Sequence, residues 1–306
     1  MNLLQLLFPD FSLILCGWLL CRYTALDRKV WEPVEALVYY FLFPVLLFHS
    51  VVRQPLDLGS ASTLIAAVVM LALSGIALSY VLPYLPVIGR HIDRRDHAAG
   101  AQVAFRFNSF IGLAVMDRLA GPQAVQMLAI LMGFCIPMFN TAAVWPMARQ
   151  SGTHFGSAVI RNPLIIATVS GLLANLAGLS IPSWLEPTIT RIGASSIALG
   201  LMAAGGGLQL SSLAQSKALS TSLLVIKHLA LPLIALWLAR LMRLDPLQTS
   251  TFLCFSALPT ASSGYVLAAR MGYNGPFVAA LVTLSTLLAA LSIPFALGVL
   301  LPLASP

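Results

Sequence analysis

The chain has 306 residues, of which 59% are hydrophobic and only 9% are charged. A soluble globular domain typically carries roughly 25% charged residues, so this composition excludes a soluble domain and indicates an integral membrane protein. The formal net charge of +7 is then explained by basic loops on one side of a membrane, and we expect no nucleic-acid partner.

Apolar segments long enough to cross a bilayer follow one another along the whole chain with short links between them. A helix needs ~20 apolar residues to cross the hydrocarbon core. The ten predicted spans are residues 3–22, 33–52, 61–85, 98–118, 122–147, 160–179, 190–211, 218–240, 247–269 and 275–301. The first span is predicted to be retained, because MNLLQLLFPD has no basic region and no small-residue cleavage site follows it.

The basic residues divide unequally between alternate links. One set of links holds ten of them, namely Arg22, Arg28, Lys29, Arg90, Arg94, Arg95, Arg149, Arg161, Lys217 and Arg270. The other set holds five, namely Arg53, Arg118, Arg191, Arg240 and Arg243. Because cytoplasmic loops carry an excess of Lys and Arg, we predict a multi-pass protein of the plasma (inner) membrane with both termini on the outer side.

The two halves of the chain show weak internal similarity. A shift of 154 residues places Pro9 on Pro163, Gly17 on Gly171 and Glu32 on Glu186, and a shift of 157 places Ile136 on Ile293. Five spans is an odd number, so the second half enters the membrane from the opposite side. We therefore predict two inverted five-helix repeats, residues 1–150 and 156–306, an arrangement suited to alternating access.

Polar and helix-breaking residues interrupt the fourth and ninth spans at mid-depth. The fourth span contains RFNSFIGLAV, with Arg106, Asn108, Ser109 and Gly112, and the ninth contains SALPTASSG, with Pro259, Thr260, Ser262 and Ser263. Proline lacks an amide donor and glycine lets the backbone unwind, so both spans are predicted to be broken. Unwound backbone in hydrocarbon is tolerated only within protein or beside a water-filled cavity.

These residues have the chemistry of a small-anion site. If the broken helices cross, the N-termini of their half-helices direct partial positive charge at one spot. Asn108 can donate and accept hydrogen bonds, and Arg106 can form a fork with a carboxylate. Asn140, in the fifth span, would line the same cavity or join two helices by a hydrogen bond.

Several residues allow a structural interpretation as well. The hydroxyls and glycines can serve close helix packing, and Arg106 can snorkel towards the headgroups. Lys227 is expected to snorkel or, failing that, to act as a counter-ion. His49 and His228 are expected to be structural. The four cysteines lack metal-binding spacing, so we expect packing residues, no metal site and no cofactor; they are Cys16, Cys21, Cys135 and Cys254.

The sequence lacks mid-membrane carboxylates and several catalytic motifs, which argues against some classes of membrane protein. All ten acidic residues lie in links or near span ends, so no mid-membrane carboxylate offers an obvious proton relay or sodium ligand. Neither H-E-x-x-H nor G-x-S-x-G nor an ATP-binding G-x-x-x-x-G-K-[ST] occurs, which argues against an intramembrane enzyme or direct ATP driving. An exported anion needs no coupling ion, since the potential contributes ~2.3 kcal/mol per charge per 100 mV.

Four stretches resemble the bacterial branch of the auxin efflux carrier family. They are LILCGWLLCRYTALDRKVWEPVEALVYYFLFPVLLFHS, RFNSFIGLAV, RNPLIIATVSGLLANLAGL and ALPTASSGYVLAARMGYN, and the resemblance extends over essentially the whole chain. It implies ten transmembrane helices in two inverted five-helix repeats, similar to bile acid sodium symporters, with helices 4 and 9 broken where they cross. It also implies a scaffold of helices 1, 2, 6 and 7, often dimeric, and an elevator-like transport domain formed by helices 3–5 and 8–10.

The resemblance also implies a function and two site residues. Family members carry organic anions such as auxin, malate or malonate; Asn108 matches the crossover asparagine and Pro259 the crossover proline. Ala114 and Ala198 stand where prolines are usual, so the break in helix 4 must rest on Gly112 and the polar side chains. We expect a secondary active or facilitative transporter that exports small organic anions, with a sodium- or proton-coupled symporter as the alternative. Its partners would be this anion, the lipid bilayer and a second copy of the chain.

Overall fold

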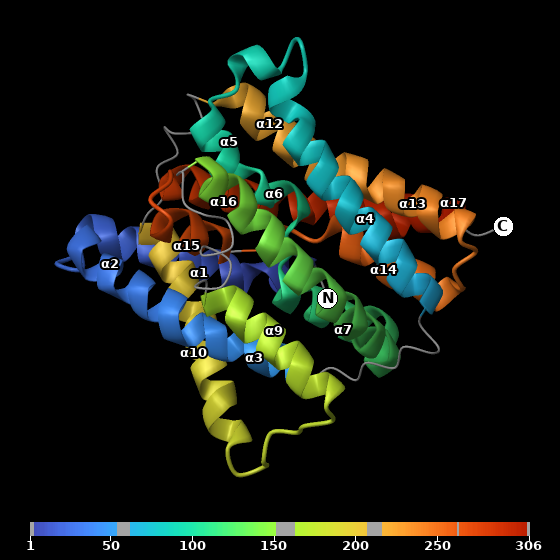
Figure 1. Cartoon of the computed structure of the whole chain (residues 1–306), viewed down its shortest axis with the longest axis horizontal. Coiled ribbons are helices and arrows are strands. Elements are labelled where there is room, and N and C mark those ends of the chain that lie inside the picture. The colour runs from blue at the N-terminus through green and yellow to red at the C-terminus, as the bar shows by residue number, and fades with distance from the viewer. Residues whose placement is uncertain (1–2, 54–61, 151–162, 207–215, 262, 305–306) are drawn as a thin grey trace.

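The computed structural model describes residues 3–53, 62–150, 163–206, 216–261 and 263–304. Every regular element within these residues is helical, so the expected all-α class is confirmed for them (Figure 1). In the first half of the chain the helices are α1 (Leu3–Tyr23), α2 (Arg28–Leu37), α3 (Phe43–Val52), α4 (Ser62–Val81), α5 (Arg94–Gly100), α6 (Gln102–Phe105) and α7 (Ser109–Gln150).

The second half contains a similar series. Its helices are α9 (Pro163–Leu176), α10 (Glu186–Gly206), α12 (Lys217–Val225), α13 (Leu231–Leu241), α14 (Pro246–Ala257), α15 (Ser263–Arg270), α16 (Gly275–Phe295) and α17 (Leu301–Ala304). Wider π-helical turns join several of them end to end, namely η1 (Val38–Leu42), η4 (Ile226–Ala230) and η5 (Ala296–Leu300). Two short 3-10 turns, η2 (Leu82–Tyr84) and η3 (Gly89–His91), follow α4.

Two boundaries show local sequence determining the helix ends. The second predicted span begins at Arg28 instead of residue 33, because the Asp27 carboxylate accepts the Lys29 N–H at 2.9 Å and caps α2. The fourth and fifth predicted spans are joined within α7, where Gly121 has φ 71 and ψ −163. This left-handed backbone favours glycine, and it separates the two helical stretches where the sequence predicts a link.

Four of the described helices are long and apolar enough to cross a membrane on length and composition alone. They are Ser62–Tyr84, Leu131–Arg149, Lys217–Leu241 and Gly275–Ala304. The ninth predicted span is divided between α14, with 12 residues, and α15, with 8, so neither part reaches that length alone. The described chain is therefore a helical bundle that contains both long apolar helices and interrupted helices.

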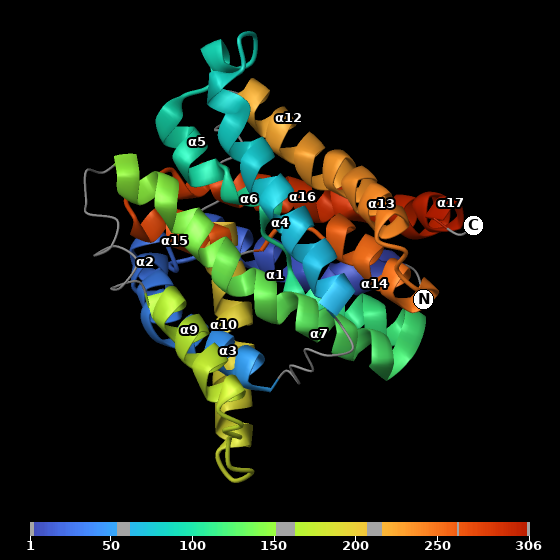
Figure 2. The ribbon, with the colours of Figure 1, turned by 45° about the vertical axis from the view of Figure 1, so that its right-hand side comes forward.

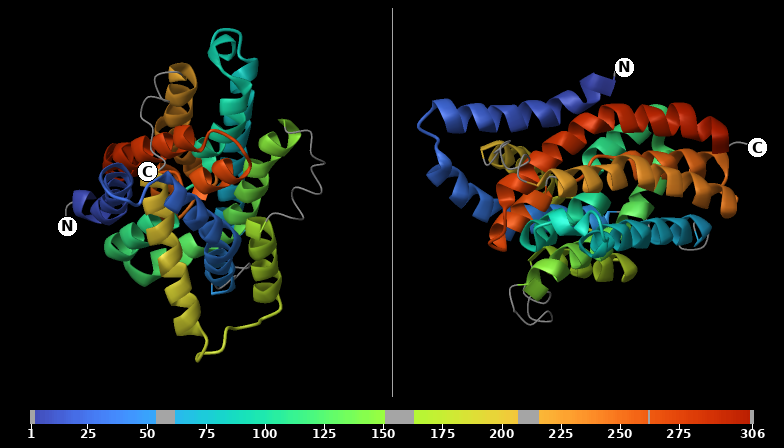
Figure 3. Two further views of the ribbon diagram at one scale, coloured as in Figure 1. Left: turned by 90° about the vertical axis from the view of Figure 1, so that its left-hand side faces the viewer. Right: turned by 90° about the horizontal axis from the view of Figure 1, so that it is seen from above.

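The helices pack in two groups (Figures 1 and 2). In the first group α1 packs along α10, α3 packs against α9 and α10, and α2 packs against α10. In the second group α4 and α14 each pack against both α7 and α13. Figure 3 shows α1 running along one side of the molecule, and its beginning lies toward the same end as α17.

Helix α1 comes very close to α10 at Gly17. A β-carbon at Gly17 would meet the backbone carbonyl of Met202 on α10. The two backbones can therefore approach this closely only because Gly17 has no side chain, as is common at helix contacts in membranes.

We expect Gly17→Ala to lower the stability of the protein by about 1–3 kcal/mol, because the added methyl group pushes α1 away from α10. Thermal unfolding of purified protein in detergent measures this. Gly298→Ala is the matched control, since a β-carbon there meets nothing within 4 Å. Equal melting temperatures for the two variants would contradict the close α1–α10 contact.

Candidate functional site

Two interrupted helices meet in the interior of the protein. Helix α6 ends at Phe105, Arg106 is extended with φ −68 and ψ 159, and α7 begins at Ser109. Helix α14 ends at Ala257 and α15 begins at Ser263. The predicted interruptions of the fourth and ninth spans are therefore confirmed at the RFN and LPTA segments.

The two non-helical segments are joined directly through their backbones. The Asn108 N–H donates to the Pro259 carbonyl at 2.8 Å. The Asn108 side-chain oxygen accepts the Ile111 N–H at 3.3 Å and so caps the start of α7. Asn108 and Pro259, predicted as partners in one site, are thus in contact, and each interruption supplies a backbone partner to the other within protein.

Arg106 lies at the centre of this crossing and is 5% exposed. Its guanidinium donates to the Gln102 Oε1 at 3.2 Å, to the Asn140 Oδ1 at 3.0 Å and to the Ser263 Oγ at 2.7 Å. Arg106 therefore does not snorkel towards headgroups. All three of these acceptors are neutral, so the positive charge is held in the interior by dipoles and is not cancelled by them.

The remaining predicted site residues occupy different positions. Gly112 is buried in the first turns of α7, and a β-carbon there would meet the Leu258 side chain at 2.7 Å, so glycine permits the close approach of the two interruptions. Ser109 begins α7 and is partly buried. Thr260 is 1% exposed and lies in the second interruption. Ser262 lies outside the described residues.

Gln102 is a site residue that the sequence reasoning missed. It lies one helical turn before Arg106, and besides accepting from Arg106 its side chain donates to the Gly264 carbonyl at 3.1 Å and to the Ala99 carbonyl at 3.0 Å. Gln102 thereby links α6 to the start of α15. Its position four residues before an intramembrane arginine was the available signal, because residues four apart share a helix face.

A histidine and two serines hold the LPTA segment, which is the interruption between α14 and α15. The His228 ring nitrogens lie 2.8 Å from Ser285 Oγ and 2.9 Å from Ser292 Oγ, both on α16. Ser285 accepts the Thr260 N–H at 2.9 Å, and Ser292 donates to the Ala257 carbonyl at 2.9 Å. With a neutral imidazole that donates from Nδ1 and accepts at Nε2, every one of these bonds is satisfied.

His228 therefore has the structural role expected for it. It ties the turn η4 to both ends of the LPTA segment through α16. Ser285 and Ser292 were not singled out from the sequence, although seven residues place two side chains on one face of a helix.

We expect Ser285→Ala to destabilise the protein by about 1–3 kcal/mol, because the buried Thr260 N–H loses its acceptor. Thr286→Val is the control, since the Thr286 hydroxyl bonds only within its own helix, to the Val282 carbonyl at 2.9 Å. Thermal unfolding should separate the two variants clearly. If Ser285→Ala unfolds with the control, the hydroxyl does not hold the interrupted segment.

Lys227 is a second interior cation. It is 2% exposed on η4, which packs against α6, α14 and α16, so the expectation that it snorkels is wrong: these helices surround the turn. Among the described residues no carboxylate forms an ion pair with Lys227 or Arg106. The interior around the crossing is therefore electropositive.

A buried polar contact joins α2 to α15. Glu35 on α2 is 4% exposed and pairs with Arg28 at 2.5 Å. The Tyr265 hydroxyl on α15 donates to Glu35, and Arg28 donates to the same hydroxyl oxygen at 3.1 Å. Arg270 at the end of α15 donates to the Glu32 carbonyl at 2.5 Å. We call this set of bonds the α2–α15 contact; the sequence reasoning did not find it.

The crossing offers donors for an anion and few ligands for a metal ion. In the described part of the chain, no three or more His, Cys, Asp and Glu side chains are grouped so that they could hold a metal ion. Amide, hydroxyl and guanidinium groups instead surround the crossing. Crossing interrupted helices inside an apolar, all-helical chain define a multi-pass membrane protein with a polar interior site.

Comparisons with known proteins agree with this class. A family model described as "Membrane transport protein" matches residues 144–297, and the chain belongs to this family of membrane transporters, the auxin efflux carriers. A protein of Rhizobium meliloti (strain 1021) named "Putative malonate transporter" is 23% identical over 304 residues, covering 94% of this chain and 92% of that protein.

Two further relatives are similar over most of their length. The "Uncharacterized transporter YfdV" of Escherichia coli (strain K12) is 23% identical over 279 residues, covering 86% of this chain and 87% of that protein. An "Uncharacterized transporter" of Methanothermobacter thermautotrophicus is 25% identical over 288 residues, covering 92% and 93%. The resemblance to the auxin efflux carriers is confirmed, and the chain is a membrane transporter.

Proposed function

We propose that this transporter is a secondary active or facilitative carrier that exports small organic anions through the plasma (inner) membrane. The observation that carries the proposal is Arg106, buried at the crossing and bonded there to three neutral acceptors. A buried charge without a counter-charge is costly, and a carboxylate substrate would supply one. A guanidinium has more N–H donors than the three used here, so donors remain for a substrate.

The ends of the half-helices add to this preference. Helices α7 and α15 both begin beside the crossing, at Ser109 and Ser263. Unpaired N–H groups and partial positive charge gather at helix N-termini, and discontinuous transporter helices use them for anionic groups. We therefore place the substrate carboxylate between Arg106, Asn108 and the starts of α7 and α15, with Gly112, Asn140, Pro259, Thr260, Ser262 and Ser263 around it.

The substrate class follows from the same chemistry together with one relative. A mono- or dicarboxylate fits a site with a guanidinium fork and amide and hydroxyl donors. The printed name of the Rhizobium meliloti relative, which includes malonate, supports a short dicarboxylate. Export down the membrane potential requires no coupling ion, and among the described residues no carboxylate forms an ion pair with Arg106 or Lys227.

We expect Arg106→Gln and Asn108→Ala each to reduce transport at least about tenfold, because each removes a bond of more than about 1.4 kcal/mol to the anion. Efflux of labelled malonate or malate from liposomes under an imposed potential, without sodium or pH gradients, measures this. Arg191→Gln, an exposed charge on α10, is the control and should transport normally.

Each other outcome of this assay contradicts a specific part of the proposal. Normal efflux by both site variants would remove the substrate from the crossing. Efflux that starts only when a sodium or proton gradient is imposed would replace the uncoupled exporter with a symporter. A melting curve of each variant shows whether lost transport reflects lost folding.

We further propose that transport uses an elevator-like movement between two inverted five-helix repeats, residues 1–150 and 156–306. Helices α1, α2, α3, α9 and α10 would be the scaffold, and the other helices would carry the substrate. Packing of these scaffold helices with one another supports the division. We propose that the scaffold forms a homodimer; α9 carries a row of exposed side chains that suits lipid or a second copy, namely Ile166, Val169, Leu173 and Leu176. Both termini would lie on the outer side.

The α2–α15 contact tests the movement, since it joins the proposed scaffold to the proposed moving part. We expect a cysteine pair at Glu32 and Arg270, joined by a cleavable bifunctional thiol reagent in a background without native cysteines, to stop transport. Reduction of the reagent should restore it, and the unjoined pair is the control. Undiminished transport by the joined protein would mean that α2 and α15 do not separate during the cycle.

A further inference from the structure

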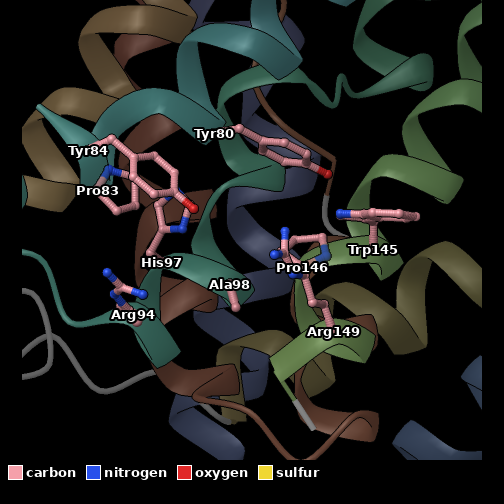
Figure 4. Close-up of a pocket in the computed structure, with 9 residues that line it drawn as sticks. All are labelled: Tyr80, Pro83, Tyr84, Arg94, His97, Ala98, Trp145, Pro146 and Arg149. Atoms are coloured by element: carbon pink, nitrogen blue, oxygen red, sulfur yellow. The ribbon is translucent and has the colours of Figure 1, made fainter. Parts of the chain in front are cut away.

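A polar cavity lies away from the crossing, at the ends of three helices (Figure 4). Its volume is about 330 Å³, within the ~300–1,000 Å³ typical of small-molecule sites. The lining residues come from the end of α4 with η2, from α5 and from the end of α7: Tyr80, Pro83, Tyr84, Arg94, His97, Ala98, Trp145, Pro146 and Arg149. Neither Arg106 nor Asn108 is among them, so this cavity is separate from the proposed transport site.

The cavity lies where two apolar spans end. The apolar spans Ser62–Tyr84 and Leu131–Arg149 both end in it, at Tyr84 and Arg149. Tyr84 is 72% exposed and Trp145 is 40% exposed, although both are large aromatic residues. Aromatic side chains at the ends of membrane spans mark the depth of the lipid headgroups.

Two arginines face the cavity from opposite sides. Figure 4 shows Arg94, His97 and Tyr84 on one side, Trp145, Pro146 and Arg149 on the other, and Ala98 between them. Among the described residues no acidic side chain lines the cavity, and neither Arg94 nor Arg149 forms an ion pair.

The neighbouring charged groups are already engaged elsewhere. Arg95 donates to the Gly272 carbonyl at 2.9 Å and lies 5.6 Å from the centre of the Tyr273 ring. Asp93 caps α5 by accepting the N–H groups of Arg95 and Asp96, each at 2.8 Å. Asp96 accepts from Ser216 at 2.7 Å and from the Asn274 amide at 3.0 Å. The positive charge inside the cavity is therefore left for a ligand.

Two polar groups of the cavity wall, on His97 and Tyr80, already have partners inside the protein. His97 Nε2 lies 2.8 Å from the Ser79 carbonyl, so this nitrogen carries a proton and donates to it. The Tyr80 hydroxyl donates to the Ala142 carbonyl. Both groups direct their hydrogen bonds into the protein, and the two guanidinium groups are the charged donors available to an incoming ligand.

We propose that this cavity binds the phosphate group of an anionic phospholipid. A phosphodiester between Arg94 and Arg149 would be held by charge-assisted hydrogen bonds, which guanidinium groups form well. Exposed Trp145 and Tyr84 would contact the glycerol and upper acyl region, as amphipathic rings do at this depth. Basic pockets between membrane helices are a known place for such headgroups. A free phosphate ion shares the charge but not the apolar contacts, which is why we assign the site to the lipid.

The consequence for the protein is a ligand that joins three helix ends. The turn η2, which follows α4, contributes Tyr84, α5 contributes Arg94 and α7 contributes Arg149, and all three elements belong to the first half of the chain. The single negative charge of a bound phosphodiester would lie between two like charges that otherwise face each other across the cavity, and it would reduce their repulsion. It would stabilise the folded protein in proportion to the occupancy of the site.

Thermal unfolding of the full-length protein in detergent tests this proposal with three probes: phosphatidylglycerol, phosphatidylcholine and inorganic phosphate. At about a hundredfold excess over its Kd, phosphatidylglycerol should raise the melting temperature by roughly 5 °C. Phosphatidylcholine and inorganic phosphate should have little effect. The double variant Arg94→Gln/Arg149→Gln should bind phosphatidylglycerol at least about tenfold more weakly, which corresponds to ~1.4 kcal/mol.

Arg90→Gln is the matched control, because Arg90 is an exposed arginine of η3 next to these helices that does not line the cavity. It should respond to phosphatidylglycerol as the wild type does. An equal response of the double variant would overturn the site, and an equal response to phosphatidylcholine would overturn the role of charge. A shift by inorganic phosphate as large as that by phosphatidylglycerol would overturn the lipid in favour of a soluble anion.

Discussion

The rest of the structure depends on a single backbone hydrogen bond, from the Asn108 N–H to the Pro259 carbonyl. In hydrocarbon an interrupted helix leaves polar backbone groups that cost several kcal/mol each when unpaired. Each interruption here supplies a partner for the other, so the two must lie in contact. Helices α6 and α7 on one side, and α14 and α15 on the other, are therefore positioned relative to one another by the need to satisfy these groups.

Around that bond the protein collects neutral polar groups and cations. Gln102, Asn140 and Ser263 hold Arg106, while His228 works through α16 to hold the ends of the second interruption. Neutral acceptors orient a guanidinium without cancelling its charge, and for this reason we propose an anion site here and not a structural ion pair. The Arg28–Glu35 pair shows the contrast, since there the charge is matched inside the protein by a carboxylate and a tyrosine hydroxyl.

Three polar regions of the molecule differ in position: the crossing, the Arg94–Arg149 cavity and the α2–α15 contact. The crossing lies in the interior and has few routes for charge compensation other than a ligand. The Arg94–Arg149 cavity lies where two apolar spans end, within reach of lipid headgroups. The α2–α15 contact joins a helix of the proposed scaffold to a helix of the proposed moving part, so its bonds would have to change if one moved past the other. A membrane transporter must bind its substrate, change conformation and stay anchored in the bilayer, and we assign one of these requirements to each region.

Much of this could be read from the sequence, because composition and local chemistry act over short distances. Low charge and repeated apolar segments determined a helical membrane protein, and RFNS and LPTA determined where two helices break, since proline and polar side chains disrupt helices locally. The capping aspartate and Gly121 likewise determine helix ends from within a few residues. Asn108 and Pro259 could be named as partners because each lies in such a break.

Only the tertiary structure decided which distant residues meet. From the sequence, Arg106 could be a site residue or could snorkel towards the headgroups. In the structure it is buried against Asn140 and Ser263, which come from two other helices, so it lies in the interior. The sequence predicts that Lys227 snorkels, but α6, α14 and α16 pack around η4 and bury its side chain. The His228–Ser285–Ser292 bonds and the grouping of Arg94 with Arg149 could not be predicted, because the residues involved are far apart in the chain. Helix breaks are properties of a few adjacent residues, whereas charge compensation depends on which helices pack together, and that is decided by the whole fold.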